Sequence, residues 1–262
     1  MNAAAEPILR HDVDARGVHT LTLNTPQAFN ALSEAMLAEL STALDRVAAD
    51  EQARVVVLAA AGKAFCAGHN LKEMKAHPTE AYYRQLFAQC SRMMMQIQKL
   101  PVPVVARVQG LATAAGCQLV AQCDLAVAVD SARFGVNGID VGLFCATPSV
   151  PLVRNVPTKV AMEMLLTGEF ISAQQAQARG LVNRVVPAEA LDAEVERLVA
   201  AILAKPRVAI AMGKAVFYQH RETGIEAAYQ LAGHTMACNM AHEVAQEGVQ
   251  AFIDKRAPAW RA

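Results

Sequence analysis

The chain has 262 residues with 24 Lys and Arg against 24 Asp and Glu, so its formal net charge is zero. This length can bury a sizeable core and suits one large domain or a domain with an extension. A neutral balance argues against a nucleic acid or a membrane surface as partner, because both favour a basic excess. The apolar stretch 102–129 is broken by charged and amide side chains, so we expect no membrane span there.

Six cysteines lie at positions 66, 90, 117, 123, 145 and 238, without a CxxC pair or a histidine cluster at metal spacing. This pattern indicates reduced thiols, no metal site and a cytoplasmic protein. Residues 1–12 carry acids and lack an apolar core of signal-peptide length, so we expect no targeting segment there. Because no flavin or nicotinamide motif is visible either, the sequence predicts no cofactor.

The first half of the chain alternates strands with helices. Strands are predicted at 18–24, 54–60, 101–110 and 125–129, the second being a β-branched run typical of a strand covered on both faces. Helices are predicted over 36–47, with Ser33 as N-cap, and over 79–99. Another helix is predicted to begin in ATAAGCQLVAQCD (112–124). This alternation indicates the α/β class.

The last third is mostly helix-forming. Thr158 and Ser172 are predicted to cap two helices, and Gly180 has the position of a C-terminal glycine. Beyond a short strand at 182–186, helices are predicted over 189–255, with Pro206 as the main break. We therefore predict a core over residues 1–200 and a helical region over 201–262. This region packs either against a neighbouring subunit or back onto its own core.

Two turns rich in small residues follow predicted strands. Residues 66–68 in GKAFCAGHNLKEM (62–74) and residues 114–116 both leave the backbone accessible. Two free N–H groups from separate turns are what an oxyanion hole requires, since aligned amide dipoles stabilise a developing negative oxygen. The N–H groups at a helix start also lack acceptors within the helix. Small residues at such turns also serve packing alone, so the local pattern leaves both interpretations open.

Six motifs extend over residues 18–257 in a fixed order: LNTPQAFNALS, RVVVLAAAGKAFCAGHNLKEM, LPVPVVARVQGLATAAGCQLVAQCDLAVA, FGVNGIDVGL, LLTGEFISAQQAQARGLVNRVV and AFIDKRAP. In this order and spacing the chain resembles the crotonase (enoyl-CoA hydratase/isomerase) superfamily. GHNLKEM, ATAAGCQL, GIDVGLFCATPSV and MEMLLTGEFISAQ are most similar to its third enoyl-CoA-hydratase-domain-containing subfamily.

The resemblance implies a ClpP-like spiral of ββα units with C-terminal helices that build homotrimers, commonly paired into hexamers. It also implies fatty acid metabolism and an acyl-CoA thioester as ligand, with coenzyme A as part of the substrate. The thioester carbonyl would accept hydrogen bonds from two backbone N–H groups. By motif these belong to His69, after CAG, and to Ala115 in TAAG. The family usually has glycine at the second position, so alanine keeps the N–H but narrows the pocket.

Further positions match those that line the CoA moiety in the family. Near the two turns they are Gln27, Ala28, Ala67, Gly68, His69, Asn70, Leu71, Lys72 and Ala115. Phe252 and Lys255 in AFIDKR match positions that reach the nucleotide end, and we expect them to come from a neighbouring subunit.

The chain departs from the family where hydratases carry two glutamates. Gln118 has the place of the first, and Gly138 in FGVNGIDVGL has the place of the second. An amide orients a water but accepts no proton, and each lost acid or base is worth about 10²–10⁴-fold. We therefore expect weak hydration, which Gln118→Glu with Gly138→Glu should raise. Isomerases of the family mostly keep the second glutamate or place an aspartate one turn further on, at about Ala146 here.

Other side chains have both a chemical and a structural interpretation. The His69 ring either acts on the acyl group, as in the AGH-containing methylmalonyl-CoA decarboxylase, or points to solvent. Asp140 would share a face with position 138 in a strand, although a structural hydrogen-bonding role is favoured. The remaining expectations are structural: Cys145 and Cys117 line the acyl pocket, Asp124 fixes a turn, and methionines 93–95 belong to the core.

Three functions remain open at this point. The first is an enzyme of the lyase or isomerase class that works mainly by oxyanion stabilisation, through slow hydration, isomerisation or decarboxylation. The second is a non-catalytic acyl-CoA-binding protein that kept the pocket and lost the acids. The third is a structural oligomer with a vestigial pocket, which the intact CAG and TAAG turns disfavour.

Overall fold

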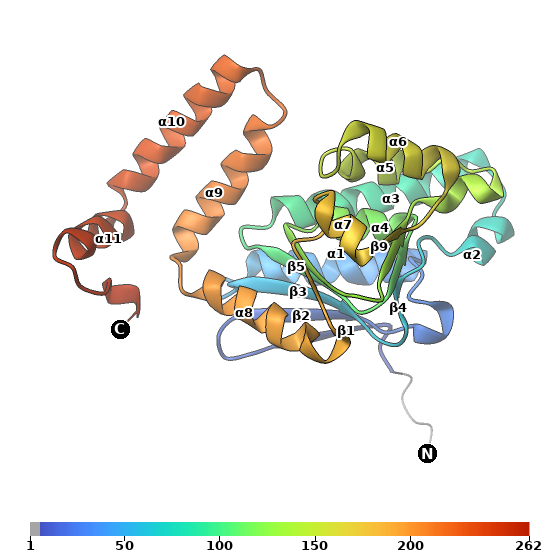
Figure 1. Ribbon diagram of the computed structural model, residues 1–262, viewed down its shortest axis with the longest axis horizontal. Coiled ribbons are helices and arrows are strands. Elements are labelled where there is room, and N and C mark those ends of the chain that lie inside the picture. The colour runs from blue at the N-terminus through green and yellow to red at the C-terminus, as the bar shows by residue number, and fades with distance from the viewer. Residues whose placement is uncertain (1–5, 262) are drawn as a thin grey trace.

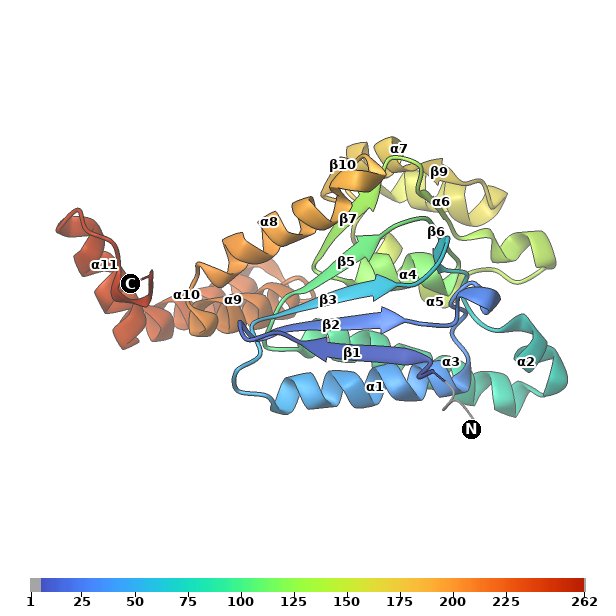
Figure 2. The ribbon, with the colours of Figure 1, turned by 90° about the horizontal axis from the view of Figure 1, so that it is seen from below.

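The computed structural model describes residues 6–261, so the expectations for residues 1–5 and for position 262 concern parts outside the described residues. A six-stranded sheet runs through the core in the order β1-β2-β3-β5-β7-β10 (Figures 1 and 2). Its strands are β1 (Leu9–Val13), β2 (Val18–Leu23), β3 (Val55–Ala60), β5 (Val104–Val108), β7 (Leu125–Val129) and β10 (Arg184–Val186). Only the β1–β2 pair of this sheet is antiparallel.

A smaller sheet has the order β4-β6-β8-β9. It is built from β4 (Ala64–Cys66), β6 (Leu111–Thr113), β8 (Arg133–Gly135) and β9 (Ile171–Ser172). Strands β3, β5 and β7 are each followed by a strand of this sheet and then by helices, so the chain repeats a ββα unit. These helices are α2 (Leu71–Ala76), α3 (Glu80–Lys99), α4 (Ala115–Gln122), α5 (Ala146–Leu152) and α6 (Thr158–Thr167). The predicted α/β spiral is confirmed.

Helices cover the large sheet because their apolar residues recur at helical spacing. Helix α1 (Glu34–Ala49) packs against β1 and β2, and α8 (Leu191–Leu203) packs against β3, β5 and β7. As predicted, Ser33 caps α1, its Oγ accepting from the N–H of Met36 at 3.1 Å. All six residues of β3 are buried, as expected for a strand covered on both faces.

The predicted helix caps are partly right. Ser172 forms a capping box at the start of α7 (Ala173–Ala178), and Gly180, with φ of 89°, lies two residues beyond its end. Thr158 is instead the first residue of α6, and Pro157 takes the cap position without a side-chain hydrogen bond. Proline fixes φ near the helical value, so it starts the helix without a polar cap. Short 3₁₀ segments complete the chain: η1 (Pro26–Ala28), η2 (Asn137–Val141), η3 (Ala188–Ala190) and η4 (Ala259–Arg261).

The three methionines of α3 do not share one environment. Met93 and Met94 are buried as predicted, whereas Met95 is 51% exposed. Consecutive helical residues lie about 100° apart, so three in a row cannot all face the core.

Beyond Pro206 the chain forms α9 (Arg207–His220), α10 (Ile225–Ala241) and α11 (Glu243–Ile253), which extend away from the core (Figure 1). Helix α8 runs through residue 200 and packs on the sheet, and the division into two regions at this residue stays a prediction. Asp124 does more than fix a turn, because its carboxylate accepts from Lys214 Nζ at 2.7 Å and from the Tyr218 hydroxyl at 2.8 Å, both on α9. This contact ties α9 to the core.

Candidate functional site

The two small-residue turns lie directly against each other at the ends of β4 and β6. Gly68 has φ of 87°, and a Cβ there would come within 2.9 Å of the Ala114 Cβ and 3.1 Å of the Ala115 nitrogen. A Cβ on Gly116 would lie 2.1 Å from the carbonyl oxygen of Cys66. Glycine is therefore required at both positions, because the two backbones approach to contact.

The N–H groups of His69 and Ala115 are directed away from the surrounding secondary structure. Leu32 and His69 form a parallel bridge, in which Leu32 N–H donates to Gly68 O at 2.7 Å and Asn70 N–H donates to Leu32 O at 3.4 Å. In such a bridge the N–H of His69 itself points away from Leu32. Ala115 is the first residue of α4, where an N–H has no acceptor within the helix. Both donors can therefore serve a ligand.

The residue before α4 has a strained backbone. Ala114 has φ of 50° and ψ of −121°, a conformation that L-residues rarely adopt. Its N–H donates to the Gly135 carbonyl at 2.9 Å, which holds the turn against β8. Strain of this kind costs about 1–3 kcal/mol and is concentrated at functional sites. Here it sets the direction in which α4 begins.

A cavity of about 310 Å³ adjoins the two turns. Helices α2, α3 and α5, strand β6 and the segment around η2 contribute its walls, which are mostly apolar. The large apolar side chains are Leu71, Met74, Phe87, Val141, Leu143 and Phe144. Among the described lining residues none carries a formal charge. An apolar cavity with few polar groups is typical of a small-molecule site.

His69 lines this cavity and both nitrogens of its ring are buried, so the interpretation that the ring points to solvent is wrong. Both ring nitrogens are buried without a hydrogen-bond partner among the described residues. The ring meets Phe87 edge-on, with centroids 5.4 Å apart. Burial lowers the pKa of His69, which favours the neutral imidazole.

Thr113 and Asn137 form a polar pair in the same cavity that sequence reasoning missed. The Thr113 hydroxyl donates to Asn137 Oδ1, and Asn137 Nδ2 donates to Asp140 at 3.4 Å. Thr113 pairs with Gly135 in the parallel β6–β8 ladder, which brings it beside Asn137. The feature that would have revealed this pair is therefore the register of β6 against β8, which belongs to the tertiary structure and not to a local sequence pattern.

The two positions of the missing glutamates have different surroundings. Gln118 is 4% exposed in α4, and its Oε1 has no hydrogen-bond partner among the described residues. Gly138 lines the cavity, and its N–H donates to Cys145 Sγ at 3.3 Å. A Cβ at position 138 would lie 2.4 Å from the Leu143 carbonyl oxygen. This crowding opposes a glutamate at position 138 on the present backbone, and the expected gain in hydration from Gly138→Glu stays a prediction.

Two nearby residues, Asp140 and Cys117, differ from expectation. Asp140 lies in the 3₁₀ segment η2, not in a strand. Residues two apart in a 3₁₀ helix are about 240° apart, so Asp140 does not share a face with position 138. Cys145 lines the cavity as predicted, but Cys117 is fully buried behind it, where burial raises the pKa of its thiol to about 12. Ala146 also lines the cavity.

The residues expected along the CoA moiety fall into two groups. Gln27 and Ala28 are exposed in η1, which lies beside the first turn because Ala67 N–H donates to the Phe29 carbonyl at 3.0 Å. Ala67 and Leu71 line the cavity, Lys72 is exposed, and the Asn70 side chain caps α2 by accepting from the N–H groups of Lys72 and Glu73. Phe252 is 85% exposed at the end of the tail. Within one chain, helix α11, which carries Phe252, lies at the opposite end of the molecule from α2, which helps to line the cavity (Figures 1 and 2). Lys255 follows two residues after α11.

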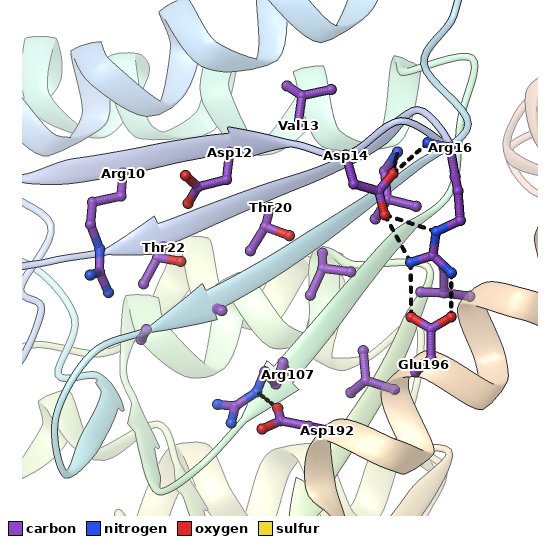
Figure 3. A pocket seen from close by; sticks show the side chains of 16 residues that line it. Arg10, Asp12, Val13, Asp14, Arg16, Thr20, Thr22, Arg107, Asp192 and Glu196 are labelled. Atoms are coloured by element: carbon purple, nitrogen blue, oxygen red, sulfur yellow. Dashed lines mark hydrogen bonds and ion pairs between the residues drawn. The ribbon is translucent and has the colours of Figure 1, made fainter.

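A second hollow of about 490 Å³ lies on the α8 side of the large sheet (Figure 3). Five of its seven charged side chains pair with one another: Arg16 with Asp14 and Glu196, and Arg107 with Asp192. These pairs tie the β1–β2 hairpin and β5 to α8. Their mutual neutralisation makes this hollow a weaker candidate than the cavity with unpaired polar atoms.

Two further searches cover only the described residues. No group of three or more His, Cys, Asp or Glu side chains could hold a metal ion there. None of the helices in that part of the chain is long and apolar enough to cross a membrane. The expected lack of a cofactor stays a prediction.

The spiral of ββα units and the two turns in contact at its cavity define the crotonase class of proteins. Residues 14–262 match the model of the enoyl-CoA hydratase/isomerase family, and the chain belongs to that family. It is 46% identical over 256 residues to the mouse protein named enoyl-CoA hydratase domain-containing protein 3, mitochondrial, covering 98% of this chain and 85% of the relative. With the human protein of that name the identity is 45%, covering 93% and 80%.

Solved structures agree with this assignment. An enoyl-CoA hydratase from Mycobacterium smegmatis matches with a TM-score of 0.97 and 64% identity, covering 98% of this chain and all of the other. The structure of human enoyl-CoA hydratase domain-containing protein 3 matches with a TM-score of 0.93 and 43% identity, covering 97% and 100%. The resemblance read from the six motifs is confirmed.

The comparisons also correct one expectation. Reduced thiols and the composition of residues 1–12 led us to expect a cytoplasmic protein. The mouse, rat, frog and human relatives, at 45–47% identity, are all named mitochondrial. Their names contradict the cytoplasmic assignment. Buried thiols stay reduced in more than one compartment, so they could not decide the location.

Proposed function

We propose that this cavity binds the acyl group of a CoA thioester, and that the N–H groups of His69 and Ala115 form an oxyanion hole for its carbonyl. The family binds acyl-CoA thioesters. The observation that supports the proposal is the contact of the two turns through Gly68, which brings the backbone N–H groups of His69 and Ala115 close together. Such donors stabilise the negative oxygen of an enolate more than the neutral carbonyl, because charge develops on that oxygen.

The CoA moiety would then extend past η1 and residues 67–72. Gln27 and Ala28 are exposed beside the first turn, and the exposed Lys72 at the start of α2 offers a cation for a phosphate. Phe252 and Lys255 would contribute from a neighbouring subunit. This role is supported by their exposure at the end of a tail that extends from the core.

The reaction proposed is a lyase or isomerase step through an enolate, with feeble hydration. The cavity offers no carboxylate among its described lining residues, so a water there has no strong base. Among the described lining residues His69 is the one with an imidazole, and its lowered pKa favours the neutral ring, which supports proton transfer over decarboxylation as its role. A protein that binds acyl-CoA without turnover is the alternative.

Stopped-flow loss of the enoyl thioester absorbance tests the rate. We expect a turnover number for crotonyl-CoA well below about 10 s⁻¹, the median for ordinary enzymes. A higher value would contradict the absence of strong acid–base groups. No turnover with any enoyl substrate, together with tight thioester binding, would favour the non-catalytic alternative.

Gly68→Ala tests the oxyanion hole itself. Its new methyl would press on Ala114 and on the Ala115 nitrogen, so affinity for acyl-CoA should fall at least tenfold. Gly142→Ala is the matched control, because Gly142 has a similar φ of 78° but nothing within 4 Å of the added carbon. Equal affinities of the two variants would reject the assignment. His69→Ala should keep binding, because the donor is the backbone.

We further propose that the tail mediates self-association as a trimer or hexamer. Four apolar side chains lie on one face of α10 at helical spacing and are exposed: Ile225 (76%), Tyr229 (74%), Met236 (74%) and Met240 (43%). An apolar stripe of this length on an exposed helix is typical of a protein–protein contact.

A further inference from the structure

Strand β1 forms one edge of the large sheet, because it pairs only with β2 (Figure 2). In an antiparallel pair, alternate residues direct their N–H and C=O groups towards the partner strand and the others direct them away. The Asn24 N–H donates to Ile8 O at one end of this pair, so the even-numbered residues of β1 face β2. The main-chain groups of Leu9, His11 and Val13 therefore point outward, and they have no partner among the described residues.

An open edge of this kind binds another extended chain unless its side chains oppose the pairing. Arg10 and Asp12 are exposed charged residues of β1, and neither side chain has an ion pair or a hydrogen bond within the described part of the chain. Both adjoin the hollow of Figure 3, where they take no part in its ion pairs. Because they carry opposite charges two residues apart, a second copy of the same strand can match them.

One antiparallel register of β1 with a second copy satisfies all of these groups. It places His11 at a two-fold axis, opposite the His11 of the second copy. Leu9 then lies opposite the second Val13, so the outward main-chain groups of both strands meet in hydrogen-bonded pairs. Arg10 lies opposite the second Asp12 in a non-hydrogen-bonded pair, where side chains are closest. A shift by two residues would place Arg10 opposite Arg10 or Asp12 opposite Asp12, so the charges favour this register over its neighbours.

The surroundings of the edge agree with this pairing. Val13 is 54% exposed, and the Leu9 of the second copy would cover it. The two His11 rings would meet uncharged, because burial, together with His19 and Arg46, lowers the pKa of His11. Helix α1 contacts both β1 and β2, so the two copies of α1 would lie about 10 Å apart, as packed helices do.

We propose that β1 is the interface through which a second copy of this chain binds, by antiparallel pairing of the two β1 strands about a two-fold axis. The contact is isologous, since Arg10 of each chain meets Asp12 of the other. It uses a different element from the stripe on α10 and does not depend on acyl-CoA binding. If the tail builds trimers, β1 would join two of them, and these short contacts would then act together.

Multi-angle light scattering after gel filtration tests the proposal on the full-length protein. Wild type should contain an even number of chains. Arg10→Asp brings only carboxylates together at the contact, and Asp12→Arg brings only guanidinium groups together, so each should halve the mass of the assembly. Arg10→Asp with Asp12→Arg in one chain restores opposite charges and should restore the mass. An equimolar mixture of the two single variants should do the same, because the aspartates of one chain then meet the arginines of the other.

Arg92→Asp is the matched control, since Arg92 is exposed on α3 and has no ion pair among the described residues. It should keep the wild-type mass. The β1 variants should keep the fold, because neither side chain has a partner to lose within one chain. An odd number of chains in wild type, or single variants that keep its mass, overturns the proposal. A double variant and a mixture that both stay at half the mass overturn it as well.

Discussion

Gly138 lies at the start of η2, where the absence of a side chain lets the Leu143 carbonyl and the Cys145 thiol approach its backbone. A Cβ there would be 2.4 Å from that oxygen and 2.8 Å from the sulfur. The position is therefore closed to a carboxylate of any length unless the loop moves. Ala146, on the same cavity, is exposed and begins α5. A carboxylate side chain is thus excluded at position 138 but can be accommodated at position 146.

We accordingly predict opposite results for Gly138→Ala and Ala146→Asp. The first should lower the free energy of unfolding by about 1–3 kcal/mol, as overpacking does. The second should leave stability nearly unchanged and increase isomerisation of a 3-enoyl-CoA over wild type, because it brings a base to the cavity. Urea denaturation and a coupled isomerase assay measure the two effects. Gly213→Ala, in open space on α9, controls for glycine replacement. A stable Gly138→Ala protein would contradict the steric argument.

His69 makes the stability depend on pH. Its folded pKa is lowered by burial below the ordinary value of 6.5, so near pH 6 the unfolded chain binds a proton that the folded chain does not. The contribution of neutral His69 to the free energy of unfolding is fully present above pH 6.5. It is lost as the pH falls towards the pKa of His69 in the folded chain. The stability of wild type relative to His69→Gln should therefore decrease from pH 7.5 to pH 5. Urea titrations at several pH values measure this difference, and a constant difference would contradict a buried neutral imidazole.

At the scale of elements, a buried lysine helps to attach α9 to the core, together with Tyr218, whose hydroxyl donates to the same carboxylate. Lys214 Nζ, with its side chain 6% exposed, donates to Asp124 and to two main-chain carbonyls, those of Ile97 and Val102. All three protons of the ammonium group are thus satisfied. The Asp124 carboxylate also accepts a hydrogen bond from the N–H of Val104, the first residue of β5. One carboxylate therefore links the large sheet to Lys214 and Tyr218 of α9. The orientation of the tail depends on this contact.

Lys214→Met should lower the free energy of unfolding by about 3–5 kcal/mol, because it leaves the Asp124 carboxylate buried without its cation. It should also expose the segment around Pro206 to limited proteolysis, since α9 loses its attachment. Chemical denaturation and a protease time course measure both effects. Lys159→Met, at an exposed position of α6, should change neither. If the tail stays protected in Lys214→Met, the lysine is not essential, and the remaining contacts of α9, such as the hydrogen bond from Tyr218 to Asp124, are enough to hold it.

At the scale of the whole molecule, the tail leaves an apolar surface that a single chain does not cover. The stripe on α10 and the exposed Phe252 lie on a tail that extends away from the core (Figures 1 and 2). Helices α2 and α5, which line the cavity, lie on the other side of the molecule from α10 and α11 (Figures 1 and 2). If neighbouring subunits complete the CoA site, association and thioester affinity should be linked.

We predict a trimer or hexamer in light scattering at micromolar concentration. Tyr229→Glu with Met236→Glu should shift the protein towards the monomer and lower its affinity for acyl-CoA, because charges on the stripe oppose its burial. His234→Glu, at an exposed position about 180° around α10 from Ile225, should preserve the assembly. A monomeric wild type would contradict the role assigned to the tail.

The sequence by itself determined the elements and the two turns. The β-branched run of β3, the helical spacing of α1 with its Ser33 cap, and the small residues before α4 are local patterns, and each appears in the structure where it was expected. The family followed from the order of six motifs. These features depend on residues close together in the chain, where hydrophobic periodicity and backbone preference act directly.

Only the tertiary structure decided which side chains lie together at the site and in the contact between α9 and the core. The Thr113–Asn137 pair joins residues 24 apart, and the Lys214–Asp124 pair joins residues 90 apart. The crowding at Gly138 and the 3₁₀ form of η2 likewise depend on what packs against them. Such contacts arise from strand register and close packing of distant segments, so no local pattern in the sequence could specify them.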